Sequence, residues 1–426
     1  MSSAVAGAIA PPRYLPAAPR LLEDIDIPEI LLADLAVRHV SLRGTATIQL
    51  LASLMKLPLE PTEALFRRLN EKQYFEILRM SGDDYVFGLS PSGRKLAAER
   101  AVSSRYAGPA PVSLNAWTEA VRAQAVRPEI NRDKLRCAFS DVVVEDRLLD
   151  ALGPALISQD AMFLYGPSGT GKTSIAERLM RVFDDAVVVP WAIEVEGQIV
   201  MVADPSVHQQ VDFAAAPGGL QDVPPVDPRW LVCRRPYVAV GGELVTAMLD
   251  LQRNEADGSF RAPLHMMASN GILLIDDFGR QMMSPRDLLN RWIVPLDRRV
   301  DFLSLGNGAK FRMPFELQIV FSTNLAPHEL GDEAFLRRIP NKILLDAVGA
   351  DQFDAIFHMV MAASGIEFEA DSERVLRELC LRHSPDLRPC FPRDILNALK
   401  AIAAYEGRKF YVTHADLERA VTGYFV

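Results

Sequence analysis

The residues best suited to chemistry in this chain lie in a glycine-rich run that ends in lysine and threonine. Residues 161–180 read AMFLYGPSGTGKTSIAERLM and match G-x-x-x-x-G-K-[ST] between an apolar strand and an amphipathic helix. In such a loop backbone N–H groups surround phosphate oxygens, the lysine reaches the terminal phosphates and the threonine hydroxyl binds Mg²⁺. A glycine-rich connector is the alternative, but chance matches to this pattern are rare. The pattern predicts that ATP–Mg²⁺ is bound by Gly166, Pro167, Ser168, Gly169, Thr170, Gly171, Lys172 and Thr173.

A second pattern, GILLIDDFGR, places two aspartates at the end of an apolar strand. An Mg²⁺–nucleotide complex needs a carboxylate near the metal and a group that orients the attacking water. We assign the metal role to Asp276 and the water role to Asp277; the alternative is that both acids merely cap a buried strand. Aspartate is one methylene shorter than glutamate, which places its carboxylate about 1.5 Å further from the water, so slow hydrolysis is one expectation.

Two weaker signals follow in chain order. The strand LQIVFSTN ends in Asn324, which is a candidate to orient the lytic water, and DEAFLRRIPNKI carries Arg337 and Arg338 side by side. In isolation, an asparagine at a strand end is usually a turn residue and an arginine pair usually lies on a solvated face. Their order and spacing after the glycine-rich loop and the acidic strand favour a role in the same site.

Together these motifs resemble an AAA+ ATPase module over residues 130–426, with GPSGTGKT as Walker A, ILLIDD as Walker B, FSTN as sensor 1, FLRR as the arginine-finger region and FPRDILNAL as the sensor 2 helix. The resemblance implies that Arg337 or Arg338 reaches the γ-phosphate bound by a neighbouring subunit. It also implies that Arg393 contacts this phosphate from the same chain. Such a site is complete only in an oligomer. Asp277 departs from the family, which typically has glutamate there, so the rate of hydrolysis is left open while nucleotide binding is not affected.

A hairpin is predicted between the acidic strand and sensor 1, where RRVDFLSLGNGAKFRMPFEL has two alternating runs around Leu-Gly-Asn-Gly. It resembles the pre-sensor-1 hairpin of the clade with MoxR-type chaperones, magnesium chelatase subunits, RuvB helicases and enhancer-binding activators. The activators carry GAFTGA, whereas this chain reads VGGELVTAMLDLQRNEADGSF, which argues against a sigma-factor remodeller. Gly241 and Gly242 are interpreted either as a flexible pore element or as the first turn of a helix.

Composition sets the wider limits. The chain has 426 residues, 49% of them hydrophobic and 24% charged, and no stretch approaches 18 uninterrupted apolar residues, so neither disorder nor a membrane span is expected. The net charge of −9 does not favour nucleic acid as the default partner. Four widely spaced cysteines without a C-x-x-C pair fit a reducing cytosol, and the N-terminus lacks a signal-peptide pattern. We therefore expect a cytoplasmic protein.

The pattern of elements predicts an α/β fold: an AAA+ P-loop module, with a parallel sheet and a helical lid, preceded by a winged-helix domain. Three bursts of helical periodicity and an alternating segment around Ser-Gly-Asp-Asp suggest the winged helix, and residues 203–228 suggest a long loop. The predicted domains are a flexible tail at 1–20, a winged helix at 21–110, a helical linker at 111–157, an α/β domain at 158–346 and a helical lid at 347–426.

The winged helix leaves its partner open. Residues 21–110 contain 11 Lys and Arg against 12 Asp and Glu, a net charge of 11 − 12 = −1, and Asp83 and Asp84 lie at the expected wing tip, where they would repel phosphate. Arg67, Arg68 and Lys72 are the cluster on the candidate recognition helix. Docking to a protein is therefore favoured over DNA. The seven histidines show no metal-ligand spacing, so Mg²⁺ is the expected metal.

From the sequence we predict an ATPase that assembles into a homo-oligomer, a hexameric ring, and uses ATP hydrolysis to remodel or assemble a protein partner, as MoxR-like chaperones do. One alternative is a DNA-associated AAA+ motor or regulator that uses the winged helix. Another is a slow, nucleotide-gated switch, suggested by Asp277. The identity of the client does not follow from the sequence, and no membrane insertion is expected.

Overall fold

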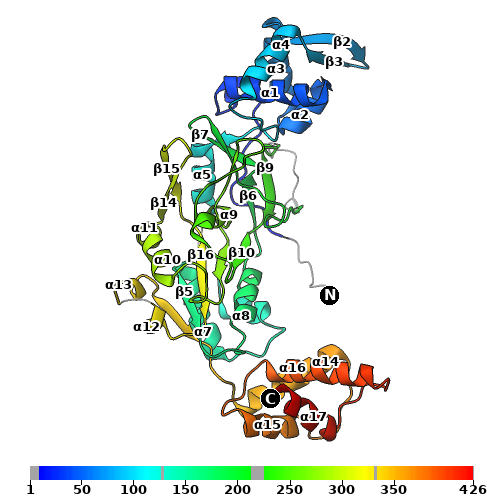
Figure 1. Ribbon diagram of the computed structural model, residues 1–426, viewed down its shortest axis with the longest axis vertical. Helices are drawn as coiled ribbons and strands as arrows, with labels where there is room; N and C mark the ends of the chain where they lie inside the picture. Colours follow the sequence, from blue (N-terminus) through cyan, green and yellow to red (C-terminus); the bar gives the residue numbers. More distant parts are fainter. Residues whose placement is uncertain (1–8, 126–128, 213–224, 331–332, 426) are drawn as a thin grey trace.

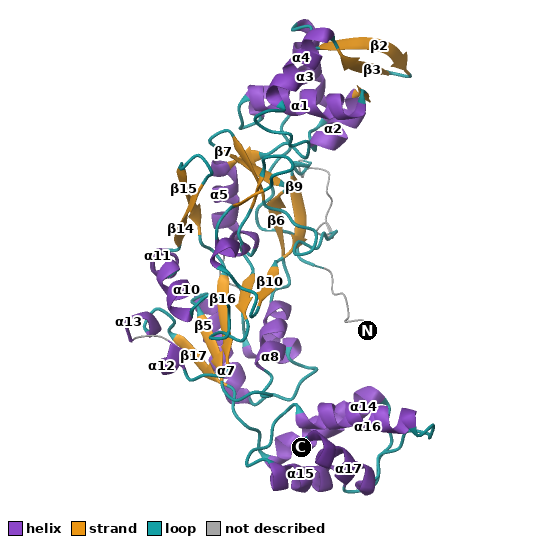
Figure 2. Ribbon diagram, viewed as in Figure 1, coloured by secondary structure: helices purple, strands orange, loops and turns teal. Residues whose placement is uncertain are grey.

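The computed structural model of the protein describes residues 9–125, 129–212, 225–330 and 333–425. Three parts follow one another along the long axis of the molecule (Figure 1): a small N-terminal domain, an α/β body and a C-terminal helical domain. Strands occur in the body and in the N-terminal domain, whereas the C-terminal part is built from helices (Figure 2).

The body contains a five-stranded sheet that includes the strand before the glycine-rich loop. The strands pair in the order β10, β13, β16, β5 and β17, and every pair is parallel. The inner strands β13 and β16 are fully buried, because both faces of the sheet are covered. In sheet order, the strand bounds are Tyr237–Val240, Ile272–Ile275, Gln318–Thr323, Met162–Tyr165 and Asn341–Leu344. The predicted α/β fold class with a parallel sheet is confirmed.

Apolar cores cover both faces of this sheet. On one face, Leu152 of α7 (Asp146–Ser158) and Leu179 of α8 (Lys172–Leu179) are fully buried in the core that includes β5. The other face carries the rings of Phe163, Phe278 and Phe321, whose centroids lie 4.9–6.0 Å apart. The other short helices of the body are α6 (Arg132–Ala138), α9 (Leu264–Met267), α10 (Pro285–Arg291), α11 (Ile293–Arg298), α12 (Pro327–Leu330) and α13 (Glu333–Leu336).

A second sheet in the body was not predicted. It has the order β11, β12, β8, β7 and β4, with bounds Gln252–Arg253, Phe260–Arg261, Gln198–Met201, Ala192–Val195 and Val112–Ser113. A separate antiparallel pair joins β6 (Ala186–Pro190) to β9 (Trp230–Arg234). Between β8 and β9, residues 203–212 and 225–228 of the predicted loop form isolated bridges but no helix or strand, and residues 213–224 lie outside the described part.

The interpretation of residues 111–157 as a helical linker needs correction. They begin with β4, and the next helix, α5 (Leu114–Gln124), packs into the core of the body. Trp117 and Val121, one turn apart on α5, are 1% and 3% exposed. Because α5 buries an apolar face against β6 and β7, and α7 covers the parallel sheet, these helices are part of the body rather than a connector.

The N-terminal tail, predicted to be flexible over residues 1–20, is held against the body where it is described. The Ala10 N–H donates to the Asp184 carbonyl over 2.9 Å, and the Ala10 carbonyl accepts from the Ala186 N–H over 3.0 Å. Further along, the ring of Tyr14 lies edge-on to Trp230, with centroids 6.5 Å apart. Residues 9–20 therefore form a segment, called the strap below, whose backbone is hydrogen-bonded to the body. Residues 1–8 lie outside the described part.

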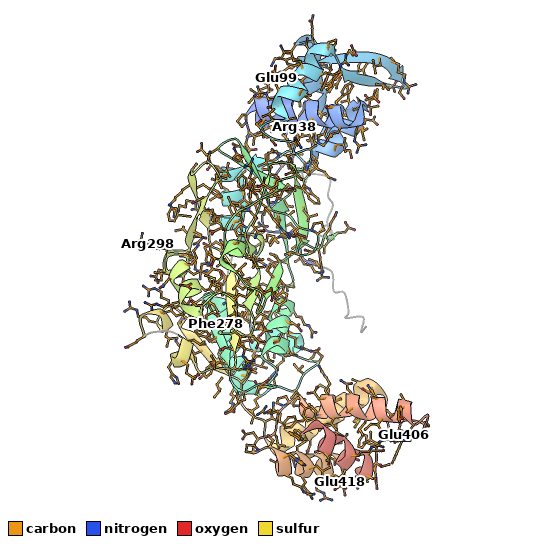
Figure 3. All side chains as sticks on the ribbon, viewed as in Figure 1. Arg38, Glu99, Phe278, Arg298, Glu406 and Glu418 are labelled. Carbon is orange, nitrogen blue, oxygen red and sulfur yellow. The ribbon has the colours of Figure 1, made fainter. Side chains whose placement is uncertain are left out.

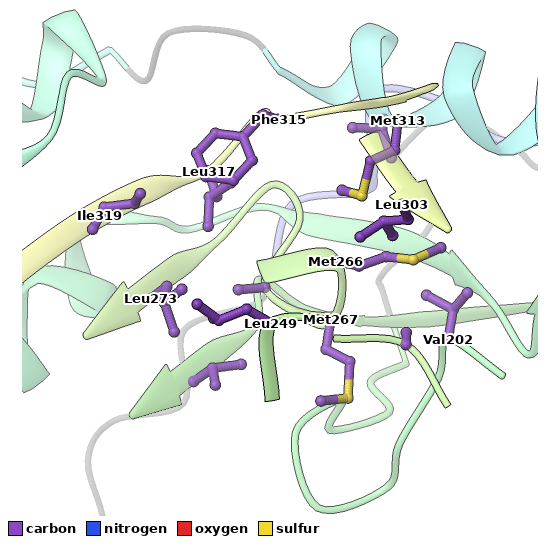
Figure 4. Close-up of a cluster of buried hydrophobic side chains, with 14 of the residues drawn as sticks. Val202, Leu249, Met266, Met267, Leu273, Leu303, Met313, Phe315, Leu317 and Ile319 are labelled. Carbon is purple, nitrogen blue, oxygen red and sulfur yellow. The ribbon is translucent and has the colours of Figure 1, made fainter. Parts of the chain in front are cut away.

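The predicted hairpin is present as β14 (Val300–Ser304) and β15 (Lys310–Pro314), joined at Leu-Gly-Asn-Gly. Figure 4 shows its inner side chains, Leu303 and Met313, close to Met266 of α9. At its base the buried Asp301 accepts two hydrogen bonds from Arg291 and lies 2.9 Å from Nε2 of His265. Burial alone would raise the pKa of Asp301, but these two partners lower it to about 2. An ionised carboxylate thus ties the hairpin to α9 and α10.

The N-terminal domain has the predicted three helices and hairpin. Phe66 of the third helix packs against Phe75 and Phe87 of the hairpin, and the strands pair in the order β1, β3, β2. Asp84, expected at an exposed wing tip, instead accepts hydrogen bonds from the backbone N–H groups of Ile48 and Gln49 at the start of α2. The elements are α1 (Glu29–Arg43), β1 (Thr45–Thr47), α2 (Ile48–Met55), α3 (Leu59–Glu71), β2 (Phe75–Ser81), β3 (Asp84–Leu89) and α4 (Pro91–Arg100).

The C-terminal domain is helical, as predicted, and has its own core around Phe353, Phe357 and Leu399. Thr413 caps the last helix by accepting from the Asp416 N–H over 3.1 Å. The helices are α14 (Ala350–Ser364), α15 (Ser372–His383), α16 (Phe391–Tyr405) and α17 (His414–Tyr424). Across the described residues, no helix has the length and apolar character needed to traverse a bilayer.

A buried histidine makes the stability of the body depend on pH. In His208, Nδ1 accepts from the Asp204 N–H and Nε2–H donates to the Met267 carbonyl, so the ring is neutral. Burial lowers the pKa of His208 below its ordinary value of 6.5. A group with a lowered folded pKa stabilises the fold above its unfolded pKa. That stability is lost as the pH falls below about 6.5, at up to about 1.4 kcal/mol per pH unit.

We predict that the urea midpoint of wild-type protein falls between pH 7.5 and pH 5.5, and that His208→Gln falls less over the same interval. His39 is also buried with a lowered pKa, so part of the dependence will remain in the variant. Tryptophan fluorescence follows unfolding, and His328→Gln, at an exposed position, serves as the control. Equal pH dependence in wild type and His208→Gln would contradict the prediction.

Candidate functional site

A cavity of about 450 Å³ lies where the carboxyl ends of the parallel strands face the C-terminal helices. The glycine-rich loop after β5, the acids after β13 and Asn324 after β16 all line it. Its apolar wall comes from residues ahead of α7 and from α14, and includes Val142, Val143, Ile356, Met359 and Val360. A polar floor beside an apolar wall suits a ligand with a polyphosphate and a flat base.

The glycine-rich loop has a conformation that only glycine adopts without strain. Gly166, Gly169 and Gly171 have φ of +140°, +82° and +88°, and a Cβ on Gly166 would lie 2.0 Å from the Leu345 carbonyl oxygen. The pattern alone identified these positions. The loop therefore begins after β5, packs closely against the residue that follows β17, and ends at the first turn of α8.

Lys172 lies at the start of α8 and is only 7% exposed. Its Nζ donates to the carbonyls of Gly166 and Pro167, at 2.9 and 2.8 Å. Burial lowers the pKa of Lys172, while the carboxylates of Asp276 and Asp277 oppose that shift. The ammonium group is thus positioned inside the loop, where its charge acts on whatever the loop binds.

The two predicted metal ligands are in direct contact. The Thr173 hydroxyl donates to Oδ2 of Asp276 over 2.8 Å, although the residues are 103 positions apart. Oδ1 of Asp276 accepts from the Asp277 N–H over 3.0 Å. Among the described residues, no group of three or more His, Cys, Asp or Glu could hold a metal. One hydroxyl and one carboxylate fit Mg²⁺, because this ion usually keeps several waters and takes further oxygens from substrate phosphates.

The two predicted water-orienting residues also meet. Nδ2 of Asn324 lies 3.4 Å from Oδ1 of Asp277, at the long limit of a hydrogen bond. Asp277 has φ of +48°, an uncommon conformation for aspartate, which turns the chain directly after β13. The hydroxyl of Ser322, in the same cavity wall, is buried without a hydrogen-bond partner in the described structure. Sequence reasoning missed Ser322, although it lies two residues before Asn324 and so shares its side of β16.

The C-terminal domain contributes the sensor 2 candidate. Arg393, near the start of α16, lines the cavity together with Cys390 and Asp394. The Cys390 N–H donates to the Gly169 carbonyl over 3.3 Å, so this end of the domain touches the glycine-rich loop directly. The structure thus places Arg393 on the lining of the same cavity as the glycine-rich loop.

Arg337 and Arg338 do not line this cavity within the chain. They follow α13, which projects from the side of the body away from α8 (Figure 1). Arg338 is bound by Asp297, with Nε 2.8 Å from Oδ2, whereas Arg337 is exposed. Figure 3 shows Arg298, at the end of α11, on the same side of the body. A residue on this side acts at a phosphate site only if that site belongs to another copy.

Comparisons with known proteins add little detail. A family model described as a domain of unknown function, DUF8689, matches residues 349–423, and a search of curated proteins gave no match. The chain is similar to the solved structure of NtrX from Brucella abortus at 15% identity, over 73% of this chain and 58% of NtrX, with a TM-score of 0.37. It is also similar to the RuvB Holliday junction branch migration motor of Thermotoga maritima, at 13% identity over 66% and 70% of the two chains, with a TM-score of 0.38. It therefore spans less than two thirds of NtrX.

Two glycines of the loop offer a matched pair of substitutions. Both have a left-handed φ, but a Cβ on Gly169 would lie 2.6 Å from Sγ of Cys390, while a Cβ on Gly171 meets nothing within 4 Å. We predict that Gly169→Ala and Gly171→Ala each lose about 1 kcal/mol of stability from backbone strain. Only Gly169→Ala should also displace Cys390 and accelerate its alkylation by iodoacetamide severalfold, measured by mass spectrometry. The exposed Cys137 is the internal reference. Equal Cys390 alkylation rates in the two variants would contradict the predicted contact.

Proposed function

We propose that this chain is an AAA+ ATPase that binds ATP–Mg²⁺ in the cavity beneath its C-terminal helices and hydrolyses it at the interface with a second copy. The observation that carries the proposal is the 2.8 Å contact between Thr173 and Asp276 beside the buried Lys172. A hydroxyl, a carboxylate and an ammonium group at one end of a polar cavity are the groups that a metal-bound triphosphate requires.

Each residue has a distinct task in this proposal. The backbone N–H groups of the loop and the Lys172 ammonium hold the phosphates, and Thr173 and Asp276 hold the metal side of the ligand. When bound, Mg²⁺ neutralises charge that develops on the phosphate oxygens. Asp277 accepts a hydrogen bond from the attacking water and Asn324 orients that water, so that its oxygen faces the terminal phosphorus.

The guanidinium that completes the site comes, in this proposal, from Arg337 of a neighbouring subunit. Two arginines were candidates by sequence. Arg338 is engaged with Asp297, while Arg337 is exposed on the side of the body away from the phosphate-binding loop. Arg337 is therefore the better candidate. A head-to-tail interface that pairs this side with the cavity of the next copy closes into a ring, and we propose the hexamer.

The N-terminal domain is proposed to be a winged helix that docks a protein client, as in MoxR-like chaperones. The order of its helices and its β2–β3 hairpin support the winged helix, and the β14–β15 hairpin of the body supports the resemblance to MoxR-like chaperones. On α3 and directly after it, the three basic residues that a DNA-binding helix would present are paired with acids: Arg67 with Glu63, Arg68 with Glu23 and Glu29, and Lys72 with Glu29. Because these pairs offset the positive charge, a DNA-associated motor is the weaker proposal.

The role of Arg337 in a neighbouring copy is testable by mixing two inactive variants. Arg337→Ala should bind ATP normally but lose about 10³-fold or more of its phosphate release. Lys172→Ala should lose nucleotide binding. In a 1:1 mixture, about a quarter of the interfaces pair an intact loop with an intact arginine, so about a quarter of wild-type turnover should return.

Arg338→Ala in the same mixture is the control, because its partner Asp297 lies within the chain. We expect Arg338→Ala alone to retain turnover if its pairing is structural. Absence of any recovery in the Arg337→Ala and Lys172→Ala mixture, with oligomers intact by light scattering, would rule out the proposed complementation between subunits.

Asp277 provides a second test, which bears on the alternative of a slow switch. Asp277→Asn keeps the size of the side chain but removes its charge, so ATP affinity should be unchanged while phosphate release falls about 10²-fold or more. Asp277→Glu should release phosphate faster than wild type if the shorter side chain limits the rate. Unchanged phosphate release in Asp277→Asn would exclude Asp277 as the water-orienting group.

A further inference from the structure

A side-chain amide closes the turn that carries Asp277. Gln281 lies four residues after Asp277, in the segment that follows β13. Its Oε1 accepts from the Gly279 N–H over 2.8 Å, and its Nε2 donates to the Asp276 carbonyl over 2.8 Å. Because the backbone N–H can only donate and the carbonyl can only accept, these two contacts determine which end of the amide is the nitrogen. The amide therefore links the residue before Asp277 to the second residue after it.

The turn that this amide closes has an unusual backbone. Two of the three residues directly after Asp276 have a positive φ, +48° at Asp277 and +107° at Gly279. Between them, the Phe278 N–H donates to the carbonyl of residue 322 over 2.7 Å, and the Phe278 carbonyl accepts from the Thr323 hydroxyl over 2.7 Å. The middle of the turn is thus fixed to β16 through Phe278, and its two flanks are tied together by the amide.

The position of the Asp277 carboxylate depends on this backbone. The Asp277 side chain is exposed, and its contact with Nδ2 of Asn324 is 3.4 Å long. A contact of this length does little to hold a carboxylate in place. An aspartate side chain has only two torsions, so a rotation of the backbone at Asp277 moves the carboxylate directly. The groups that hold the turn therefore determine where the carboxylate lies.

We propose that Gln281 is a positioning residue for the reaction with water: its amide holds the turn so that the Asp277 carboxylate faces the attacking water beside Asn324. This inference rests on the proposed function and extends it to a residue outside the motifs that the sequence revealed. Gln281 is not among the residues that line the cavity, so it acts through Asp277 and not on the nucleotide. Loss of its amide therefore slows the step with water and leaves nucleotide binding unchanged.

The test combines steady-state phosphate release with calorimetric titration of the full chain with ATP in Mg²⁺. Gln281→Ala removes both hydrogen bonds and should lower kcat about 10- to 100-fold, because a displacement of about 1 Å at a reacting group can cost 10²-fold. The Kd for ATP should be unchanged. Gln281→Glu keeps the size of the side chain, but its carboxylate cannot donate to the Asp276 carbonyl, so kcat should fall here too.

Gln252→Ala is the matched control. The Gln252 amide also donates to a backbone carbonyl, that of Ala247, over 3.1 Å, but it lies on β11 and does not line the cavity. This variant should keep the kcat and the ATP affinity of wild type.

A double variant separates positioning from a general loss of structure. Asp277→Asn lacks the carboxylate that Gln281 positions, so the addition of Gln281→Ala should leave its residual phosphate release unchanged. A merely structural role would lower kcat by the same factor in the wild-type and Asp277→Asn backgrounds. The two effects are thus distinguished by the ratio of the four rates.

Three outcomes would overturn the inference: wild-type kcat in Gln281→Ala, an equal fall of kcat in both backgrounds, or weaker ATP binding with unchanged kcat. If Gln281→Ala does not fold, judged by its melting temperature, Gln281→Glu takes its place and the same criteria apply. Failure of the proposed function gives a different result, because wild type itself would then bind no ATP or release no phosphate.

Discussion

The structure depends on the alignment of three parallel strands, because β5, β16 and β13 all end at the same edge of the sheet. Thr173, Asn324 and Asp276 follow these strands at distant points in the sequence, and they line one cavity only because the strands are in register. The 2.8 Å hydrogen bond between Thr173 and Asp276 is a direct result of that alignment. A shift of one residue in the pairing of one strand would turn its side chains to the opposite face of the sheet. The polar end of the cavity would then not form.

The same edge holds backbone conformations that the chain would otherwise avoid. Asp277 has φ of +48°, and the loop glycines occupy the left-handed region. In a residue other than glycine, such as Asp277, this conformation costs about 1–3 kcal/mol and persists only where the surroundings determine it. Here Phe278, which is labelled in Figure 3, directly follows the two aspartates. It is fully buried against Phe163 and Phe321, so aromatic packing behind the site holds the acids in place.

The grouping of most candidate residues in one cavity was predictable, because these residues lie in short contiguous motifs whose chemistry restricts the residue type. The second sheet could not be predicted, because strands of two to four residues are too short to show an alternating hydrophobic pattern. They also pair with strands far away in the sequence, as Val112 does with Ile193. The strap at residues 9–20 is proline-rich and lacks periodicity. Arg337 and Arg338 are equivalent in sequence, and only Asp297, 41 residues away from Arg338, distinguishes them.

The unpredicted sheet also explains how the N-terminal domain is attached. The segment between β10 and β13 was considered as a pore element. In the structure, its first turn is held by a hydrogen bond from the Met282 N–H to the Gly242 carbonyl, and its far end forms β11 and β12. The loop between those strands accepts the Arg105 N–H at the Asp257 carbonyl, directly after the N-terminal domain. The segment between β10 and β13 thus contacts Met282, which follows the paired aspartates, and Arg105, which follows the N-terminal domain. The chain that leaves the N-terminal domain is therefore anchored to the second sheet, through the same segment that contacts the residues after the paired aspartates.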